Sequence, residues 1–425
     1  MNVVGSRSPN EAKLNVTLAS DVKGWNKTVN EQLVIELAKN PRLKVSGFVP
    51  RHTEEQRKHA RSLNIELVDA EDLSGYSPTE LLGHPPECLS IDILLIHSHG
   101  PGLGRQAQVI KKDKKCKWAQ VVHMISEEVN KFLENPDEYD DEHKLQITLC
   151  EKADVIVAIG PKVADAYKRA LRYSGKNERV FQLTPGVFEE LIGIRQVYED
   201  DNVDKFVVLI SGSSYYFRVK GCDIASKAVK LLNKPSYHLL VVLRPCEKVH
   251  VAEIYRALRR EGIDSRQLAV RVSENHADWR RWLCEVNLVI KPSRTEGFGL
   301  SGLLAISADV PVLVSSYTGL GKVLEKLPSG PIHVVKSDDP QIWADKIKEV
   351  REKGLHTGHL QAEELKNEYM KQFSWKEQCD QLVETFFEMV QQNRGKFLNY
   401  ILAKSCQQLT VIHLHCQQGS NLILE

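Results

Sequence analysis

Residues Lys291 to Leu313 read "KPSRTEGFGLSGLLAISADVPVL" and join two β-rich runs through an acid that is followed by a glycine turn. The run "VNLVIKPS" leads into this stretch, and the run "VPVLVSS" closes it. Both are nearly continuous Val, Leu and Ile, which is typical of strands buried on both faces of a parallel sheet. Glu296 follows the first run and is itself followed at once by "GFG" and a weakly amphipathic segment. The order strand, turn, helix, strand predicts a βαβ unit.

The same alternation of β-rich runs and helical patterns continues along the chain. The first half contains "LNVTLAS", "LKVSGFV", "IELVD", "DILLIHSH", "WAQVVHM", "DVIVAIG" and "VFQLTPG". The second half contains "KFVVLISG", "HLLVVLRP", "LAVRVS", "VNLVIKPS", "VPVLVSS" and "IHVVKS". Between runs, apolar residues such as Val29, Leu33 and Leu37 recur on one helical face. The fold class predicted is α/β, with doubly wound parallel sheets.

The length of the chain favours two domains. A chain of 425 residues exceeds one ordinary core and suits two domains of roughly 150 to 200 residues each. The strand series restarts after the acid-rich stretch "IRQVYEDDNVDK" (Ile194 to Lys205), which suits a linker. We therefore predict Rossmann-like domains at 13–195 and 203–374, a C-terminal helix at 375–393 that crosses back to the first domain, and an unassigned tail at 394–425.

Composition excludes several function classes. The net charge is +1, so the chain has no global field to attract nucleic acid or an anionic membrane. The nine cysteines are scattered without a CxxC, which favours free thiols over a disulfide framework or a zinc site. The first residues, "MNVVGSRSPNEAKLNV", lack the apolar run of a signal peptide, and no segment has the length of a membrane span. We expect a cytoplasmic protein without a transmembrane segment.

Ligands of open α/β sheets bind beyond the carboxyl ends of the strands. There, Glu296 and its glycines could offer a carboxylate to sugar hydroxyls and helix N–H groups to an anion; the alternative is a tight turn beside a solvated acid. Lys220 precedes a helix and could reach a phosphate, or could simply lie on the surface. Gly24 and His123 hold comparable positions in the first domain, where a turn and a structural histidine are the alternatives.

Other catalytic signatures are missing from the sequence. It contains no GxSxG, HExxH or Walker A loop. A dehydrogenase would need GxGxxG after the first strand, which is also missing. His97 and His99 alone are too few ligands for a metal site.

Taken together, these segments make the sequence similar to the glycosyltransferases of family 4, a retaining family with the GT-B architecture, as a divergent member resembling D-inositol-3-phosphate glycosyltransferases. The resemblance covers about Leu14 to Gln392 and is carried chiefly by "PSRTEGFGLSGLLAISADVPVLVSS". The segments "EKADVIVAIGPKV" and "FSWKEQCDQLVETF" support it by their order. It implies two Rossmann-like domains that face each other across a cleft, with the acceptor on the first and the donor on the second.

The resemblance also implies roles for individual residues. Glu296 and His123 would be catalytic and contact the donor sugar, and Lys220 would neutralise the diphosphate. The other implied donor contacts are Gly24 and the backbone of Phe298, Gly299 and Leu300. A nucleotide sugar would be the co-substrate, and neither a metal nor another cofactor is expected, because cationic side chains and a helix dipole stabilise the leaving diphosphate.

The sequence departs from the family pattern in three places. Leu304 stands where a second glutamate usually grips the ribose, and leucine accepts no hydrogen bond. Ser213 and Ser214 stand in place of an arginine that usually accompanies Lys220, and "PG" at 185–186 replaces Asn-Gly.

Arg218 and Arg244 are candidate compensating cations for the missing arginine. Two hypotheses follow: a retaining hexosyltransferase, or a catalytically impaired GT-B module that binds a sugar, a nucleotide or a partner protein. The acceptor, the donor base and sugar, and the oligomeric state are left open by the sequence.

Overall fold

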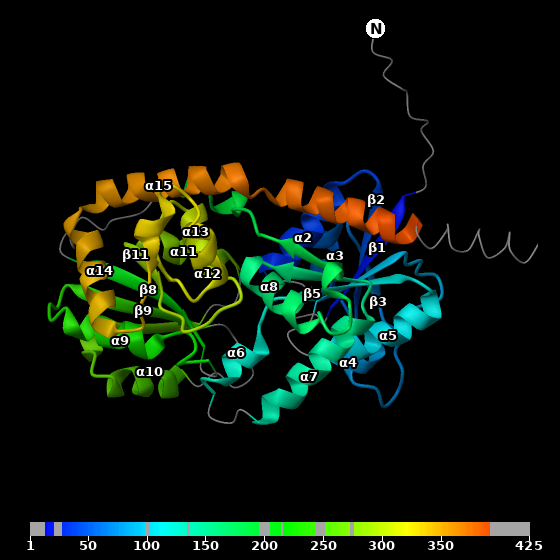
Figure 1. The fold of residues 1–425 in the computed structure, drawn as a ribbon, viewed down its shortest axis with the longest axis horizontal. Helices are drawn as coiled ribbons and strands as arrows, with labels where there is room; N and C mark the ends of the chain where they lie inside the picture. The colour runs from blue at the N-terminus through cyan, green and yellow to red at the C-terminus, as the bar shows by residue number, and fades with distance from the viewer. Residues whose placement is uncertain are drawn as a thin grey trace, which may run out of the picture.

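The computed structural model describes residues 13–20, 28–97, 102–133, 137–194, 205–213, 216–243, 251–272 and 276–391. These residues form two parallel sheets, of seven and six strands, which lie side by side with helices around each (Figure 1). The predicted α/β fold class is confirmed. Each of the predicted β-rich runs contains a strand of one of these sheets.

The first sheet has the strand order β3-β2-β1-β4-β5-β6-β7. Its strands are β1 (Leu14–Ala19), β2 (Leu43–Val49), β3 (Glu66–Asp69), β4 (Ile93–His97), β5 (Lys117–Val122), β6 (Val155–Ile159) and β7 (Val180–Leu183). The α-helices between them are α2 (Thr28–Lys39), α3 (Glu54–Ser62), α4 (Pro78–Leu81), α5 (Gly102–Lys114), α6 (Ser126–Asn130), α7 (Asp137–Lys152) and α8 (Pro161–Ala170). The order reverses between β1 and β4, where a doubly wound sheet opens its crevice.

The second sheet has the order β10-β9-β8-β11-β12-β13, with its reversal between β8 and β11. Its strands are β8 (Phe206–Gly212), β9 (Tyr237–Leu243), β10 (Leu268–Val272), β11 (Leu288–Lys291), β12 (Val312–Ser315) and β13 (Val334–Val335). Its α-helices are α9 (Cys222–Leu231), α10 (Val251–Arg260), α11 (His276–Glu285), α12 (Leu300–Ser307), α13 (Gly319–Leu324), α14 (Pro340–Glu352) and α15 (Leu355–Gln372).

Short 3-10 turns occur in both halves of the molecule. They are η1 (Asn177–Arg179), η2 (Glu189–Leu191), η4 (Ser265–Gln267) and η5 (Gly330–His333).

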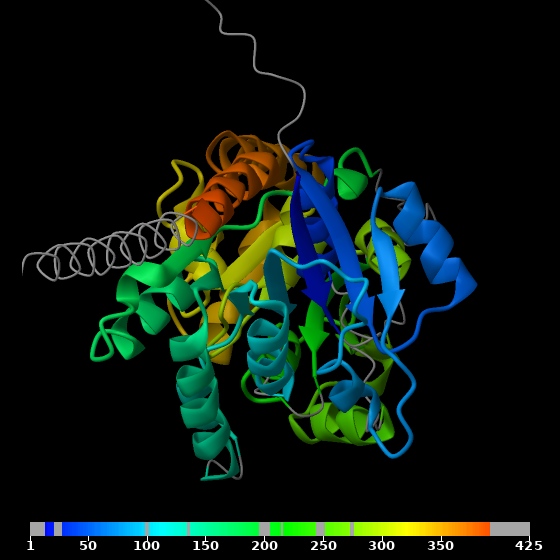
Figure 2. The ribbon, with the colours of Figure 1, turned by 90° about the vertical axis from the view of Figure 1, so that its right-hand side faces the viewer.

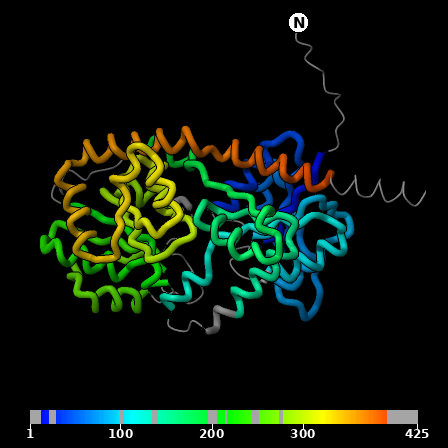
Figure 3. Tube along the Cα trace, viewed as in Figure 1, coloured from blue at the N-terminus to red at the C-terminus, as the bar shows by residue number. Residues whose placement is uncertain are grey.

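The central strands are buried along their whole length. Every residue of β4, β6 and β11 is buried, because helices cover both faces of each sheet (Figure 2). The largest apolar cluster contains Val16 of the first sheet, Val312 of the second and Phe386 of the C-terminal segment. One continuous core therefore links the two halves of the molecule, which occupy opposite ends of the trace in Figure 3.

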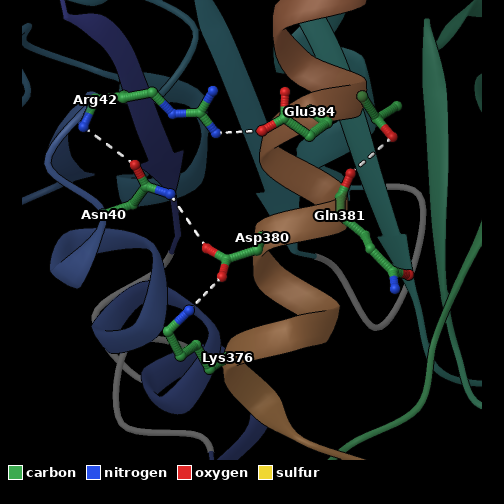
Figure 4. A network of polar contacts seen from close by, with 7 residues as sticks. Asn40, Arg42, Lys376, Asp380, Gln381 and Glu384 are labelled. Carbon is green, nitrogen blue, oxygen red and sulfur yellow. Dashed lines mark hydrogen bonds and ion pairs between the residues drawn. The ribbon is translucent and has the colours of Figure 1, made fainter. Parts of the chain in front are cut away.

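A helix over residues 375–391 follows α15 after a two-residue break and lies over the first sheet (Figure 1). Asn40 donates a hydrogen bond of 3.3 Å to Asp380, and Arg42 forms an ion pair with Glu384 (Figure 4). The backbone N–H of Thr184 donates to Gln378 Oε1 at 3.0 Å. The last helix of the described chain is thus held on the first half of the molecule.

The domain limits proposed from the sequence stay predictions. Most of the expected linker, and the tail after residue 391, lie outside the described residues. Among the described residues, no helix has the length and apolar character needed to cross a membrane. The six cysteines in these residues are free thiols, in agreement with the sequence-based expectation.

Removal of a buried ring from the last helix should weaken its docking. Phe386 is fully buried in the shared core, so Phe386→Ala is expected to lower the free energy of unfolding by about 3–5 kcal/mol. Glu388→Ala, at an exposed position of the same helix, should change it by less than about 0.5 kcal/mol. Urea denaturation followed by tryptophan fluorescence measures both. Equal midpoints for the two variants would show that the helix does not depend on this contact.

Candidate active site

Three charged side chains meet where β11 ends. Lys220 Nζ lies 2.5 Å from Glu296 Oε1, and Lys291 Nζ lies 3.1 Å from Glu296 Oε2. Ser293 Oγ donates a further hydrogen bond of 3.1 Å to Oε2. The Glu296 side chain is 13% exposed and that of Lys291 is 1% exposed. Both oxygens of one carboxylate are therefore held by cations in a largely dry environment.

Secondary structure brings these groups together. Lys291 is the last residue of β11, and Lys220 comes just before α9, which follows the neighbouring strand β8. Glu296 itself forms an isolated parallel bridge with Thr318, and its carbonyl accepts a hydrogen bond of 3.3 Å from Gly319 N–H. The carboxyl ends of two adjacent strands and the start of α13 thus fix the loop that carries the acid.

The electrostatics of this cluster keep the carboxylate ionised. Burial alone would raise the pKa of Glu296, but the charges of Lys220 and Lys291 and their hydrogen bonds hold it well below its usual value. Two ammonium groups around one carboxylate leave the cluster with a net positive charge. Such a cluster suits an anionic ligand and cannot supply a proton from Glu296 at neutral pH.

The loop after Glu296 touches the first half of the molecule. A Cβ atom on Gly297 would lie 1.9 Å from the carbonyl oxygen of His123, so only glycine fits at this point. Phe298 is buried, and its ring lies against Gly160, where a Cβ would come within 2.4 Å. Gly299 has a φ of +113° and caps α12, which begins at the next residue.

His97, the last residue of β4, lies beside His123, which immediately follows the neighbouring strand β5. Their Nε2 atoms are in direct hydrogen-bond contact, and the two rings meet edge to face at 4.3 Å. Asn30 Nδ2 lies 2.5 Å from His97 Nδ1, so the pair continues into the buried face of α2. His123 is half-buried, and its backbone adjoins Gly297.

The structure therefore brings most of the predicted residues to one place. Glu296 and Lys220 are in contact, and the backbone of His123 abuts the loop from the other side. The remaining loop residues of the prediction, Phe298, Gly299 and Leu300, follow Glu296 at the start of α12. Their implied roles in donor binding stay predictions.

The remaining candidates are placed less directly. Gly24 and Arg244 lie outside the described residues. Arg218 is exposed, and its carbonyl accepts a 2.7 Å hydrogen bond from Arg294. Lys291 was not predicted, although it is the only ionisable residue in "VNLVIKPS", and a cation that ends an otherwise apolar run was an available signal. No group of three or more metal-ligating side chains occurs within the described ranges.

The departures from the family pattern have local structural counterparts. Leu304 is 2% exposed and belongs to the large apolar cluster, so it contributes packing where a ribose-binding acid was expected. The carbonyl of Pro185 accepts a hydrogen bond of 2.6 Å from Tyr369 Oη. A Cβ on Gly186 would lie 2.7 Å from the backbone nitrogen of Trp375. The Pro-Gly pair is thus used to seat the C-terminal helices.

Comparison with known families decides the class of the protein. Residues 19–382 match the family described as "Family 4 Glycosyltransferase in conflict systems". The chain belongs to the family 4 glycosyltransferases. Among curated proteins, this glycosyltransferase is 26% identical over 325 residues to D-inositol 3-phosphate glycosyltransferase 1 of Catenulispora acidiphila, covering 72% of this chain and 74% of that protein. The corresponding enzyme of Corynebacterium urealyticum is 25% identical over 316 residues, covering 69% and 70%.

Solved structures confirm the architecture of this family 4 glycosyltransferase. Sucrose-phosphate synthase of Thermosynechococcus elongatus superposes with a TM-score of 0.68 at 16% identity, covering 89% of this chain and 99% of that one. Anabaena HepE in complex with UDP-glucose gives 0.63 at 15% identity, covering 88% and 100%. The GT-B fold predicted from the sequence is confirmed, as is the assignment to the glycosyltransferases.

The charge on Glu296 should be visible in the pH dependence of stability. Glu296→Gln leaves the buried ammonium of Lys291 and the partly buried ammonium of Lys220 without their counter-charge and is expected to cost about 3–5 kcal/mol at pH 7. The folded pKa lies below the unfolded value of about 4.3, so this contribution is complete above about pH 5 and is lost as the pH falls further. The difference between wild type and variant should therefore narrow towards pH 3 in denaturation experiments.

Glu285 provides the matched control for this experiment. It also faces two cations, Arg271 at 3.0 Å and Arg281 at 3.2 Å, but its side chain is 39% exposed. Glu285→Gln should cost less than about 1 kcal/mol at any pH in this range. A difference for Glu296→Gln that is small at pH 7, or that widens in acid, would contradict the assigned ionisation.

Proposed function

We propose that the protein is a retaining hexosyltransferase that moves a hexose from a nucleotide sugar to an acceptor hydroxyl, without a bound metal. The observation that carries this proposal is the ionised Glu296 between Lys220 and Lys291 at the carboxyl ends of adjacent strands. A carboxylate accepts hydrogen bonds from sugar hydroxyls, and the surplus positive charge favours a diphosphate beside it. The structure of Anabaena HepE with UDP-glucose supports a nucleotide-sugar donor.

The residues suit chemistry at the leaving group. When the bond from the anomeric carbon to the diphosphate oxygen breaks, negative charge develops on the phosphate. Lys220 stabilises this charge, together with the N-terminus of α12, whose cap Gly299 leaves the first amides without a side-chain partner. The proton of the acceptor hydroxyl passes to the departing phosphate oxygen as the new glycosidic bond forms on the same face of the sugar.

Glu296 is better suited to binding than to nucleophilic attack. Both of its oxygens are engaged by ammonium groups, which lowers the basicity of the carboxylate. A double-displacement glycosidase instead uses a pair of carboxyl groups about 5 Å apart. Retention by front-face attack, with Glu296 orienting sugar hydroxyls, agrees better with this arrangement.

Leu304 favours the second candidate, a GT-B module that binds a sugar or nucleotide without turnover. The apolar side chain at this position removes one hydrogen-bonding group for the ribose, which costs on the order of one to two decades in affinity. The two candidates differ in turnover and share the donor site, so binding and product formation have to be measured separately.

Binding of the donor should depend on Lys220. We expect titration calorimetry against UDP, GDP and ADP and their glucose forms to find one nucleotide series that binds. Lys220→Met should weaken that binding roughly 10- to 100-fold, since a charge-assisted contact to the diphosphate is lost. Lys230→Met, an exposed lysine on α9, is the control and should bind like wild type.

Turnover separates the two candidates. With the nucleotide sugar that binds, the transferase should release the free nucleotide, and proton NMR of the sugar product should show the donor's anomeric configuration. Binding without release would favour the module. No binding of any of these ligands at millimolar concentration would refute a donor site at Glu296.

A further inference from the structure

A second polar cluster lies beside the candidate active site, at the junction of the two halves. Lys162, in the first turn of α8, has a side chain that is only 7% exposed. Its ammonium lies 2.5 Å from Glu128 Oε2 of α6 and donates to Thr295 Oγ1 and to the Tyr317 carbonyl, each at 2.7 Å. An ammonium has three N–H donors, so these three oxygens use all of them.

Thr295 closes this cluster into a ring. Its hydroxyl accepts from Lys162 and donates its own proton to Glu128 Oε2 at 2.6 Å. Glu128 and Lys162 belong to the first half of the molecule, whereas Thr295 and Tyr317 belong to the second. The hydrogen bonds of Thr295 and of the Tyr317 carbonyl therefore depend on the two halves staying together, whereas the ion pair of Lys162 with Glu128 lies within the first half. We call Glu128, Lys162, Thr295 and the Tyr317 carbonyl the interdomain ring.

The interdomain ring contacts the loop that carries Glu296 and the segment that pairs with it. Thr295 immediately precedes Glu296 in the chain. Tyr317 immediately precedes Thr318, which is the bridge partner of Glu296. Phe298, two residues after Glu296, packs against Gly160, the N-cap of the helix that carries Lys162. One end of α8 thus contacts the loop before and after its acid.

The charges of the interdomain ring are favourable when the two halves are in contact. Burial lowers the pKa of Lys162, and Glu128 opposes this effect. For Glu128, burial would raise the pKa, but Lys162 and Thr295 hold it below its usual value. A buried ion pair is favourable only when its remaining hydrogen-bonding positions are satisfied, and here Thr295 and Tyr317 of the other half satisfy them.

We propose that Lys162 and Thr295 are positioning residues that place Glu296 for donor binding only when the two halves are closed. This inference rests on the proposed transferase function. Thr295 belongs to the loop 293–298 and Lys162 binds its hydroxyl, so both act on Glu296 through the backbone of this loop. Closure of the protein and assembly of the donor site are then one event, coupled through Lys162 and Thr295.

Thr295 offers an isosteric test. Thr295→Val keeps the shape but removes the hydroxyl, whereas Thr295→Ser keeps the hydroxyl. We expect Thr295→Val to lower kcat at least tenfold, with the affinity for the free nucleotide diphosphate within twofold of wild type, because Lys220 is unchanged. Thr295→Ser should recover most of kcat. Lys162→Met should behave like Thr295→Val, and Lys168→Met, exposed on the same helix, should behave like wild type.

Small-angle X-ray scattering of the ligand-free protein gives a readout that does not need activity. Thr295→Val and Lys162→Met should increase the radius of gyration relative to wild type, and Thr295→Ser and Lys168→Met should not. If no nucleotide sugar binds but this scattering pattern is found, the proposed function fails and the ring is still shown to hold the halves together. Unchanged scattering in both disruptive variants, or equal kcat for Thr295→Val and Thr295→Ser, would overturn the inference.

Discussion

The rest of the site depends on how one buried carboxylate is balanced by two lysines. A carboxylate that is 13% exposed would tend to protonate if it were alone. Lys220 and Lys291 make the charged form favourable because both ammonium groups are held within ion-pair distance of it. Lys291 is fixed as the end of a fully buried strand. Glu296 is fixed by its backbone bridge to Thr318. The backbone structure therefore sets the distances between the charged groups.

The candidate active site also depends on the close approach of the two halves of the molecule. Gly297 has no room for a side chain because the backbone of His123 is against it, and Phe298 fills the space at Gly160. The helix over 375–391 packs on the first half, and the shared apolar cluster includes residues of both halves. These contacts also keep the two halves together. The loop that carries Glu296 is therefore shaped by residues of both halves, although all of its sequence belongs to one.

The sequence predicted the strands well because buried parallel strands are short apolar runs, a local signal. Glu296 and Lys220 were predictable for a related reason: the carboxyl ends of such strands are where ligands bind. Lys291 was missed because a lysine at the end of a run also suits an exposed strand end. Lys162 and Thr295 were missed because their contact joins positions 133 residues apart, and no local pattern reports a pairing between domains.

The charge balance also bears on the missing arginine. Without Lys291, the ion pair of Lys220 and Glu296 would have no net charge and would offer a diphosphate no net attraction. Lys291 makes the sum positive while it stays buried, whereas Arg218, the candidate proposed from the sequence, is exposed to water that screens its charge. The buried Lys291 can therefore supply part of the attraction expected from the missing arginine, because the electric field at a ligand depends on the summed charge of the cluster. The departure at Ser213 thus coincides with a buried lysine on the neighbouring strand, which would compensate for the arginine under the proposed function.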